Sequence, residues 1–344
     1  MHLQRRQVPS EASWRAVAAR RFTRATLRPL GTFIPATPGG VRFTRRLVAG
    51  SLAVFGPPLR GTSVRRVQLA TQGAPAVRGE WVLGPGVSGA DAAVLYIHGS
   101  GYAICSARTH RGLTSRLSAD TGLPVFACDY RLAPSHRFPA AADDVRSAFE
   151  WLLTQGFPAH RIALAGDSAG GHLAMDLIGE LGRAGLPLPA AVALFSPLVD
   201  PTFALAGERD LFRPDPMISA GRARRLVAHY LRDADAEHPR LALPFDPSVD
   251  YPPTLVHAGG AEMLAADAEY LARRLRALGA RCELRVWPGQ MHVFQALPAL
   301  IPEARPAVRE AAAFLREELV PRHGTSACLF GGSRGRLARR RRSA

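Results

Sequence analysis

A serine flanked by glycines is the residue of this chain best suited to nucleophilic chemistry. The segment Gly166-Asp-Ser-Ala-Gly170 follows a short apolar run at 162–165 and precedes helically spaced apolar residues at 172–181. Glycine two residues before and after the serine permits a strained turn between strand and helix, because side chains there would collide with the packed elements. We therefore expect the Ser168 hydroxyl at the end of a buried strand. A serine that caps an ordinary helix is the alternative.

A serine hydroxyl attacks efficiently only when a base takes its proton and an acid orients that base. The 44 basic residues are all arginine, so a Ser-Lys dyad and Schiff-base chemistry are excluded. Serine hydrolases with such a turn have the chain order nucleophile, acid, histidine. His292 follows the last expected strand and is the candidate base. Glu262 follows the preceding strand and is the candidate acid, with Asp267, inside a helix, as the alternative.

A second loop of small residues, His98-Gly-Ser-Gly-Tyr102, directly follows an apolar run at 92–97. Small residues let backbone N–H groups turn toward one point, where the carbonyl oxygen of an ester becomes negatively charged during attack. We interpret this loop as the source of an oxyanion hole, with a simple tight turn as the alternative. We expect His98 to hold the loop by a hydrogen bond.

Alternating strands and helices follow these motifs along the chain. Because no internal repeat interrupts them, they predict one mostly parallel sheet with helices on both faces, over residues 61–320. The expected strands are 64–69, 78–83, 92–97, 123–128, 162–165, 189–195, 252–257 and 282–286, and the expected helices are 109–119, 143–153, 172–181, 219–231, 264–278 and 303–319.

The segments outside this pattern are basic or irregular. Residues 1–60 combine arginines with apolar residues at helical spacing, which indicates a basic cap or lid, a segment that contacts an anionic membrane surface, or a solvated helix on the core. Residues 200–250 read as an inserted lid or pocket wall. Residues 321–344 contain four consecutive arginines, at 339–342, and are expected to be a disordered tail.

Composition narrows the class of protein. The chain has 344 residues and a net charge of +16, with an ordinary hydrophobic content of 47%. Four scattered cysteines without a histidine at ligand spacing predict free thiols and no metal site. The N-terminus lacks the apolar stretch of a secretory signal, and no run is long enough to span a bilayer. We expect a cytoplasmic protein without a cofactor, with peripheral membrane contact as an added property and no specific nucleic-acid partner.

Four blocks, taken in order, give the chain a resemblance to a known family. They are Tyr96-Ile-His-Gly-Ser-Gly-Tyr102, Asp129-Tyr-Arg-Leu-Ala-Pro134 with Phe138-Pro-Ala-Ala141, Gly166-Asp-Ser-Ala-Gly-Gly171 and His292-Val-Phe294. The sequence resembles the hormone-sensitive-lipase-like esterases, and the match runs from about residue 64 to 319. The resemblance implies an α/β-hydrolase fold with an N-terminal helical cap.

The resemblance also implies roles for individual residues. Ser168 would be the nucleophile, His292 the base and Glu262 the acid. Backbone N–H groups of Ser100, Gly101 and Ala169 would form the oxyanion hole. Two departures stand out: Ser100 replaces a glycine of the family's usual His-Gly-Gly-Gly loop, and Glu262 replaces the family's common aspartate, so Asp267 stays the rival acid.

The sequence thus predicts a serine carboxylesterase that hydrolyses small-molecule or lipid esters with short to medium acyl chains, through an acyl-enzyme. A lipase or phospholipase that acts at a lipid surface is the nearest alternative, favoured by the arginine-rich ends. A non-catalytic ligand receptor on the same fold is a second alternative. The combination of Ser168, His292 and an acidic candidate argues against the receptor.

Overall fold

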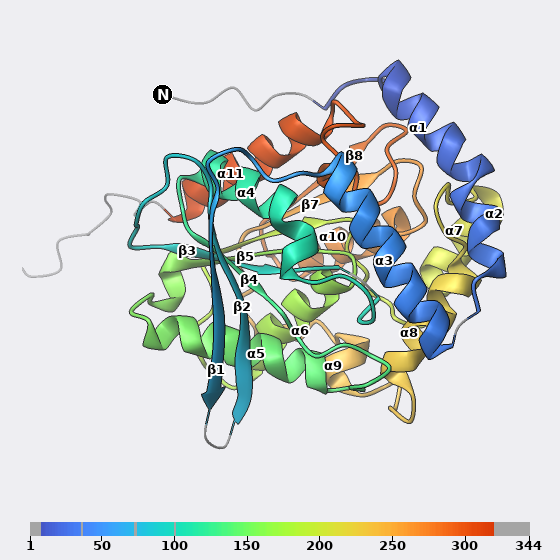
Figure 1. Cartoon of the computed structure of the whole chain (residues 1–344). Helices are drawn as coiled ribbons and strands as arrows, with labels where there is room; N and C mark the ends of the chain where they lie inside the picture. Colours follow the sequence, from blue (N-terminus) through green and yellow to red (C-terminus); the bar gives the residue numbers. More distant parts are fainter. Residues whose placement is uncertain (1–7, 36, 72–73, 100, 320–344) are drawn as a thin grey trace, which may run out of the picture.

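An eight-stranded sheet forms the centre of the computed structural model, which describes residues 8–35, 37–71, 74–99 and 101–319 (Figure 1). Its strand order is β1-β2-β4-β3-β5-β6-β7-β8. β2 pairs antiparallel with β1 and with β4, and every other neighbouring pair is parallel. The strands are β1 Ser63–Thr71, β2 Ala74–Leu83, β3 Ala93–Ile97, β4 Val125–Cys128, β5 Ile162–Asp167, β6 Ala191–Phe195, β7 Thr254–Gly259 and β8 Cys282–Trp287.

The central strands are apolar runs because both faces of the sheet are covered. Every residue of β3, β4, β5, β6 and β7 is buried. Continuous burial is typical of parallel strands with helices on both sides, whereas a half-exposed sheet requires alternation of polar and apolar residues. The predicted α/β class and mostly parallel sheet are confirmed.

Two layers of helices cover this sheet and create two buried cores. α4 Arg111–Thr121 and α11 Ala304–Leu319 cover one face. α5 Ala140–Thr154, α6 Ala169–Arg183 and α10 Ala265–Ala277 cover the other. Short 3₁₀ turns precede or follow several of these elements, at Ala107–His110, Ala159–Arg161 and Phe294–Ala296. Because the strands run parallel, the loops that follow β3, β5, β7 and β8 meet at one edge of the sheet.

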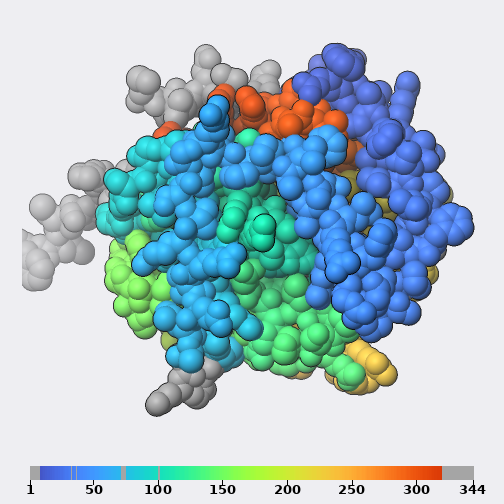
Figure 2. All heavy atoms as spheres, viewed as in Figure 1, coloured from blue at the N-terminus to red at the C-terminus, as the bar shows by residue number. Residues whose placement is uncertain are grey.

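The N-terminal segment forms three helices over that edge, α1 Trp14–Ala25, α2 Leu27–Phe33 and α3 Pro38–Phe55 (Figures 1 and 2). Hydrogen bonds from arginines to carbonyl oxygens attach them to the core. Arg45 on α3 donates to the carbonyls of Ala103 and Ala133 at 2.8 and 2.9 Å, and Arg15 on α1 donates to Ala299 at 2.6 Å.

The segment between β6 and β7 is the second covering layer. It contains α7 Ala204–Phe212, α8 Ala220–Leu231 and α9 Pro239–Ala242. The sequence predicted α8 alone, since α7 and α9 are short and follow irregular, proline-containing stretches. No helix among the described residues has both the length and the apolar character needed to cross a bilayer. The predicted disordered tail lies outside the described residues.

Candidate active site

Ser168 lies in a strained turn between β5 and α6. Its backbone has φ 51° and ψ −122°, a left-handed conformation that non-glycine residues rarely adopt. The Ser168 N–H donates to the carbonyl of Phe195 at 3.0 Å, and its carbonyl accepts from Leu198 at 2.9 Å. A Cβ on Gly170 would lie 2.0 Å from the carbonyl oxygen of Ile97. Glycine is therefore required for α6 to approach β3 this closely.

The His292 ring is held by the Glu262 carboxylate. The Nδ1–H of His292 donates to Oε2 of Glu262 at 2.6 Å, and the other carboxylate oxygen accepts the backbone N–H of Gly259 at 2.6 Å. Glu262 is completely buried. Burial alone would lower the pKa of His292, but the hydrogen bond to Glu262 and its charge raise that pKa above its ordinary value. Because Nδ1 makes the hydrogen bond to Glu262, Nε2 is the ring nitrogen that is available to a group in the pocket.

Asp267, the alternative acid, lies elsewhere in the fold. Its Oδ1 accepts the backbone N–H groups of Val199 and Asp200, both at 2.9 Å. It is fully buried, and burial raises its pKa to about 7. Its contacts thus hold the start of the segment after β6, whereas Glu262 contacts the histidine.

The turn that carries Glu262 is fastened by side chains from the β6–β7 segment. Arg209 on α7 donates to the carbonyls of Glu262 and Gly260 at 3.0 and 3.2 Å. Oδ2 of Asp215 accepts the N–H of Met263 at 2.9 Å. Oδ1 of the same buried side chain accepts the N–H of Met217 at 2.8 Å.

The backbone after His292 is also held in place. Val293 has a left-handed φ of 48°, and its N–H donates to the Ser196 hydroxyl at 3.0 Å. Ser196 is itself buried, with φ 51°. Sequence reasoning missed Ser196 and Arg209 as positioning residues. Neither belongs to a motif, and only the tertiary contact between distant loops reveals them.

Two of the three expected oxyanion donors are described by the structure. Ala169 is the first residue of α6, where a backbone N–H has no partner within the helix. Gly101 has a left-handed φ of 54°, and both Gly101 and Gly99 line the pocket that contains Ser168. Ser100 lies outside the described residues.

His98 lies directly before this loop and contacts it. Its Nδ1 is 3.0 Å from the carbonyl oxygen of Gly99, and its ring stacks on Tyr130 with centroids 4.2 Å apart. Burial lowers its pKa to about 3, so the ring is neutral at physiological pH.

A buried cluster of polar side chains lies behind the same loop. Asp167 accepts the Tyr96 hydroxyl at 2.6 Å and lies 3.4 Å from Nε2 of His110. A Cβ on Gly99 would lie 2.1 Å from Oδ2 of Asp167. Burial alone would raise the pKa of Asp167, but the nearby His110 and its hydrogen bond lower it below the ordinary value. The pKa of His110 is raised, because Asp167 outweighs the effect of burial.

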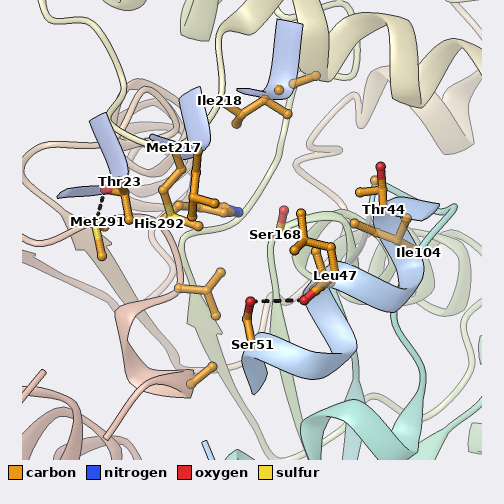
Figure 3. Close-up of a pocket in the computed structure, with 18 of the residues that line it drawn as sticks. Thr23, Thr44, Leu47, Ser51, Ile104, Ser168, Met217, Ile218, Met291 and His292 are labelled. Carbon is orange, nitrogen blue, oxygen red and sulfur yellow. Dashed lines mark hydrogen bonds between the residues drawn. The ribbon is translucent and has the colours of Figure 1, made fainter. Parts of the chain in front are cut away.

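A cavity of about 780 Å³ joins these groups. Figure 3 shows the Ser168 hydroxyl and the His292 ring directed into it, with Thr23 of α1 on one side and Thr44, Leu47 and Ser51 of α3 on the other. Its remaining walls are mainly apolar and come from the cap, the loop after β3, the β6–β7 segment and the loop after β8; they include Leu47, Val48, Ile104, Met217, Ile218 and Met291. The arrangement places a serine hydroxyl, a histidine ring and the glycine-rich loop in the wall of one mainly apolar pocket.

The described residues offer no comparable site for a metal. Their three cysteines, Cys105, Cys128 and Cys282, are free, and no group of three or more ligating side chains occurs among them.

Comparison with known proteins gives the same type of fold. Residues 94–296 match the family described as alpha/beta hydrolase fold. The chain is 35% identical over 322 residues to the carboxylesterase/phospholipase LipF of Mycobacterium tuberculosis, covering 90% of this chain and 82% of that protein. It is 36% identical over 223 residues to the acetyl-hydrolase of Streptomyces hygroscopicus, covering 65% and 75% respectively.

Solved structures agree with these sequence relatives. The crystal structure of EstE5 soaked with p-nitrophenyl butyrate matches with a TM-score of 0.80 at 32% identity, over 90% of this chain and 99% of that one. An esterase of the bacterial hormone-sensitive lipase family matches with a TM-score of 0.79 at 32% identity, over 89% and 99%.

The buried pair of His110 and Asp167 generates a pH-dependent prediction. Because the folded-state pKa of His110 is raised, its contribution to stability is complete below the unfolded pKa and is lost as pH rises through the folded pKa. We expect His110→Gln to lower the free energy of unfolding by about 3 kcal/mol near pH 6 and by less near pH 9. Urea unfolding at the two pH values measures this. The exposed His160→Gln is the control; an equal loss for His110→Gln at both pH values would contradict the prediction.

Proposed function

Because the chain belongs to the hormone-sensitive-lipase-like family of the α/β hydrolase fold and is a carboxylic ester hydrolase, we propose that it cleaves short- to medium-chain esters through a serine acyl-enzyme. The observation that carries the proposal is the 2.6 Å hydrogen bond from His292 to the buried Glu262, in the pocket that also contains Ser168. A histidine fixed in this way is suited to accept a proton at Nε2.

In the first half of the reaction, Oγ of Ser168 attacks the ester carbonyl carbon while Nε2 of His292 takes the hydroxyl proton. The carbonyl oxygen becomes an oxyanion, which the backbone N–H groups of Gly101 and Ala169 stabilise, together with that of Ser100 in the family pattern. When the tetrahedral intermediate collapses, the carbon–oxygen bond to the alcohol breaks and His292 gives its proton to the leaving oxygen. The acyl group stays on Ser168.

In the second half, water replaces the alcohol. His292 takes a proton from the water as its oxygen attacks the acyl carbon, and the same backbone donors bind the second oxyanion. The bond to Oγ then breaks, the serine regains its proton from His292, and the acid leaves. Glu262 keeps the imidazole in the correct tautomer and stabilises its charged form, which agrees with the raised pKa of His292.

The pocket supports an acyl chain longer than acetyl. Its volume of about 780 Å³ and its apolar side chains favour alkyl groups over polar ones. The related EstE5 was soaked with a butyrate ester, and the Streptomyces relative is named an acetyl-hydrolase. Both refer to short acyl groups, and the volume of the pocket supports our proposal that the range extends to medium chains.

The serine mechanism predicts a specific loss. Ser168→Ala should lower kcat for p-nitrophenyl butyrate by about 10⁴- to 10⁶-fold, because the nucleophile is removed while binding and the backbone donors remain. Stopped-flow or steady-state release of p-nitrophenol measures the change, with Ser248→Ala on the exposed loop before β7 as the control. Turnover within tenfold of the native value would exclude Ser168 as the nucleophile.

The two acidic candidates are separated by matched amide substitutions. Glu262→Gln should lower kcat/KM by about 10³- to 10⁴-fold, because the amide cannot stabilise the charged imidazole or fix its tautomer. It should also move the acidic limb of the pH profile to lower pH, since the carboxylate holds the pKa of His292 above its ordinary value. Asp267→Asn should cost less than about tenfold and leave the limb in place. The reverse ranking would transfer the role to Asp267.

The acyl range is tested with p-nitrophenyl esters from acetyl to palmitoyl, kept below their micelle concentrations. We expect kcat/KM to rise by up to about fourfold per added methylene through the short chains, because each buried methylene contributes about 0.8 kcal/mol. It should then fall before palmitoyl. Ile218→Trp, which fills the pocket, should shift the optimum toward acetyl. An optimum at palmitoyl would contradict the proposed range.

A further inference from the structure

The outer surface of the cap helices has an unusual composition. From residue 12 to residue 60 the chain contains no aspartate or glutamate, and it contains nine arginines: Arg15, Arg20, Arg21, Arg24, Arg28, Arg42, Arg45, Arg46 and Arg60. A helix that only covers a core usually presents a mixed polar face to water. This segment instead presents cations and apolar side chains.

The stripe of α3 that faces away from the pocket shows this clearly. Positions 39, 42, 43, 46, 50, 53 and 54 are exposed and follow helical spacing. They include Phe43 at 53% and Val54 at 66% exposure, beside Arg42 and Arg46. At the end of α2, Phe33 is 82% exposed. We call these five residues the cap face; their side chains lie outside the pocket lining.

The arginines of this surface lack carboxylate partners. Among the residues that the structure describes, no aspartate or glutamate lies within ion-pair distance of Arg21, Arg24, Arg42 or Arg46. The one described ion pair of the cap joins Arg28 to Asp210 on α7, at 3.2 Å. The exposed field of the cap is therefore uniformly positive, which attracts an anionic surface.

The same three helices also line the pocket. Trp14, Phe22, Leu30, Leu47 and Phe55 are exposed to solvent and also line the cavity that contains Ser168. Figure 2 shows α1–α3 as the blue surface on the right of the view, and Figure 3 shows the same helices beside the pocket. A large body that rests on the cap would cover the entrance to the site.

We propose that the cap face docks on an anionic lipid bilayer, so that ester substrates enter the pocket from the membrane. Aromatic and aliphatic side chains can insert at the boundary between headgroups and acyl chains, while arginines contact anionic headgroups. A second copy of the chain fits poorly, because a two-fold contact would place this positive surface against itself. Nucleic acid would bind the arginines, but its phosphate backbone offers no apolar environment to Phe43 and Val54.

The test is co-sedimentation of the full chain with vesicles of phosphatidylcholine or of equimolar phosphatidylcholine and phosphatidylglycerol. We expect binding to the anionic vesicles and at least tenfold weaker binding to the neutral ones. The double variant Arg42→Gln/Arg46→Gln should weaken binding by about 25-fold, at about fivefold for each arginine. The triple variant Phe33→Ser/Phe43→Ser/Val54→Ser should weaken it by at least tenfold.

Matched controls remove the same groups from other surfaces. Arg273→Gln/Arg316→Gln removes two exposed charges from α10 and α11, and Leu69→Ser/Leu186→Ser removes two exposed apolar side chains. Both control variants should bind within about threefold of the native chain. Hydrolysis of soluble p-nitrophenyl butyrate should be unchanged in every cap-face variant, which shows that the fold and the pocket are intact.

Four outcomes would overturn the proposal. The first is that the native chain does not bind anionic vesicles, and the second is that the cap-face and control variants lose vesicle binding equally. The third is that the native chain is a dimer that dissociates in the variant Phe33→Ser/Phe43→Ser/Val54→Ser. The fourth is that the chain binds duplex DNA and that only Arg42→Gln/Arg46→Gln weakens this binding. Ser168→Ala should bind vesicles as the native chain does. A failure of the serine mechanism would therefore leave the docking proposal standing, and the reverse also holds.

Discussion

The left-handed backbone at Ser168 is the constraint on which the geometry of the site depends. A non-glycine residue in such a conformation costs roughly 1–3 kcal/mol, so the surrounding structure must hold it. Backbone hydrogen bonds to Phe195 and Leu198 connect the turn to β6 and to the segment after it. Gly170 lets α6 pack against the end of β3, which also brings the first N–H groups of that helix toward the serine. The same contact thus positions Ser168, the proposed nucleophile, and the first residues of α6, which include the candidate oxyanion donor Ala169.

Parallel strand direction explains why residues so far apart in sequence meet. The loops after β3, β5, β7 and β8 all leave the same edge of the sheet, and they carry Gly101, Ser168, Glu262 and His292. A further set of contacts then fixes their relative positions, since Ser196 holds the backbone next to His292 and Arg209 holds the turn of Glu262. The β6–β7 segment is therefore part of the scaffold of the site as well as a wall of its pocket.

The sequence predicted the central strands because they are continuous apolar runs, and β3 and β5 lead into glycine-rich loops. It ranked Glu262 above Asp267 because a loop at a strand end lies closer to the site than the interior of a helix does, and only Glu262 contacts His292 in the structure. Asp215, Arg209 and Ser196 could not be found in this way. Their function depends on contacts between the β6–β7 segment and loops near 260 and 293, and a single polar residue in an irregular segment gives no local sign of such a contact.

A general bias toward arginine does not account for the cap. Such a bias would add arginines throughout the chain, and in the catalytic domain several of them are neutralised: Arg111 by Glu80, Arg131 by Asp144 and Arg285 by Glu310. The cap differs because carboxylates are missing from residues 12–60, while aromatic side chains remain exposed there. A bias that replaces lysine by arginine does not change the number of acidic residues, so it does not explain why they are missing from residues 12–60. The absence of carboxylates beside the exposed arginines and aromatic side chains of the cap therefore calls for a cause specific to the cap, and contact with an anionic surface supplies one.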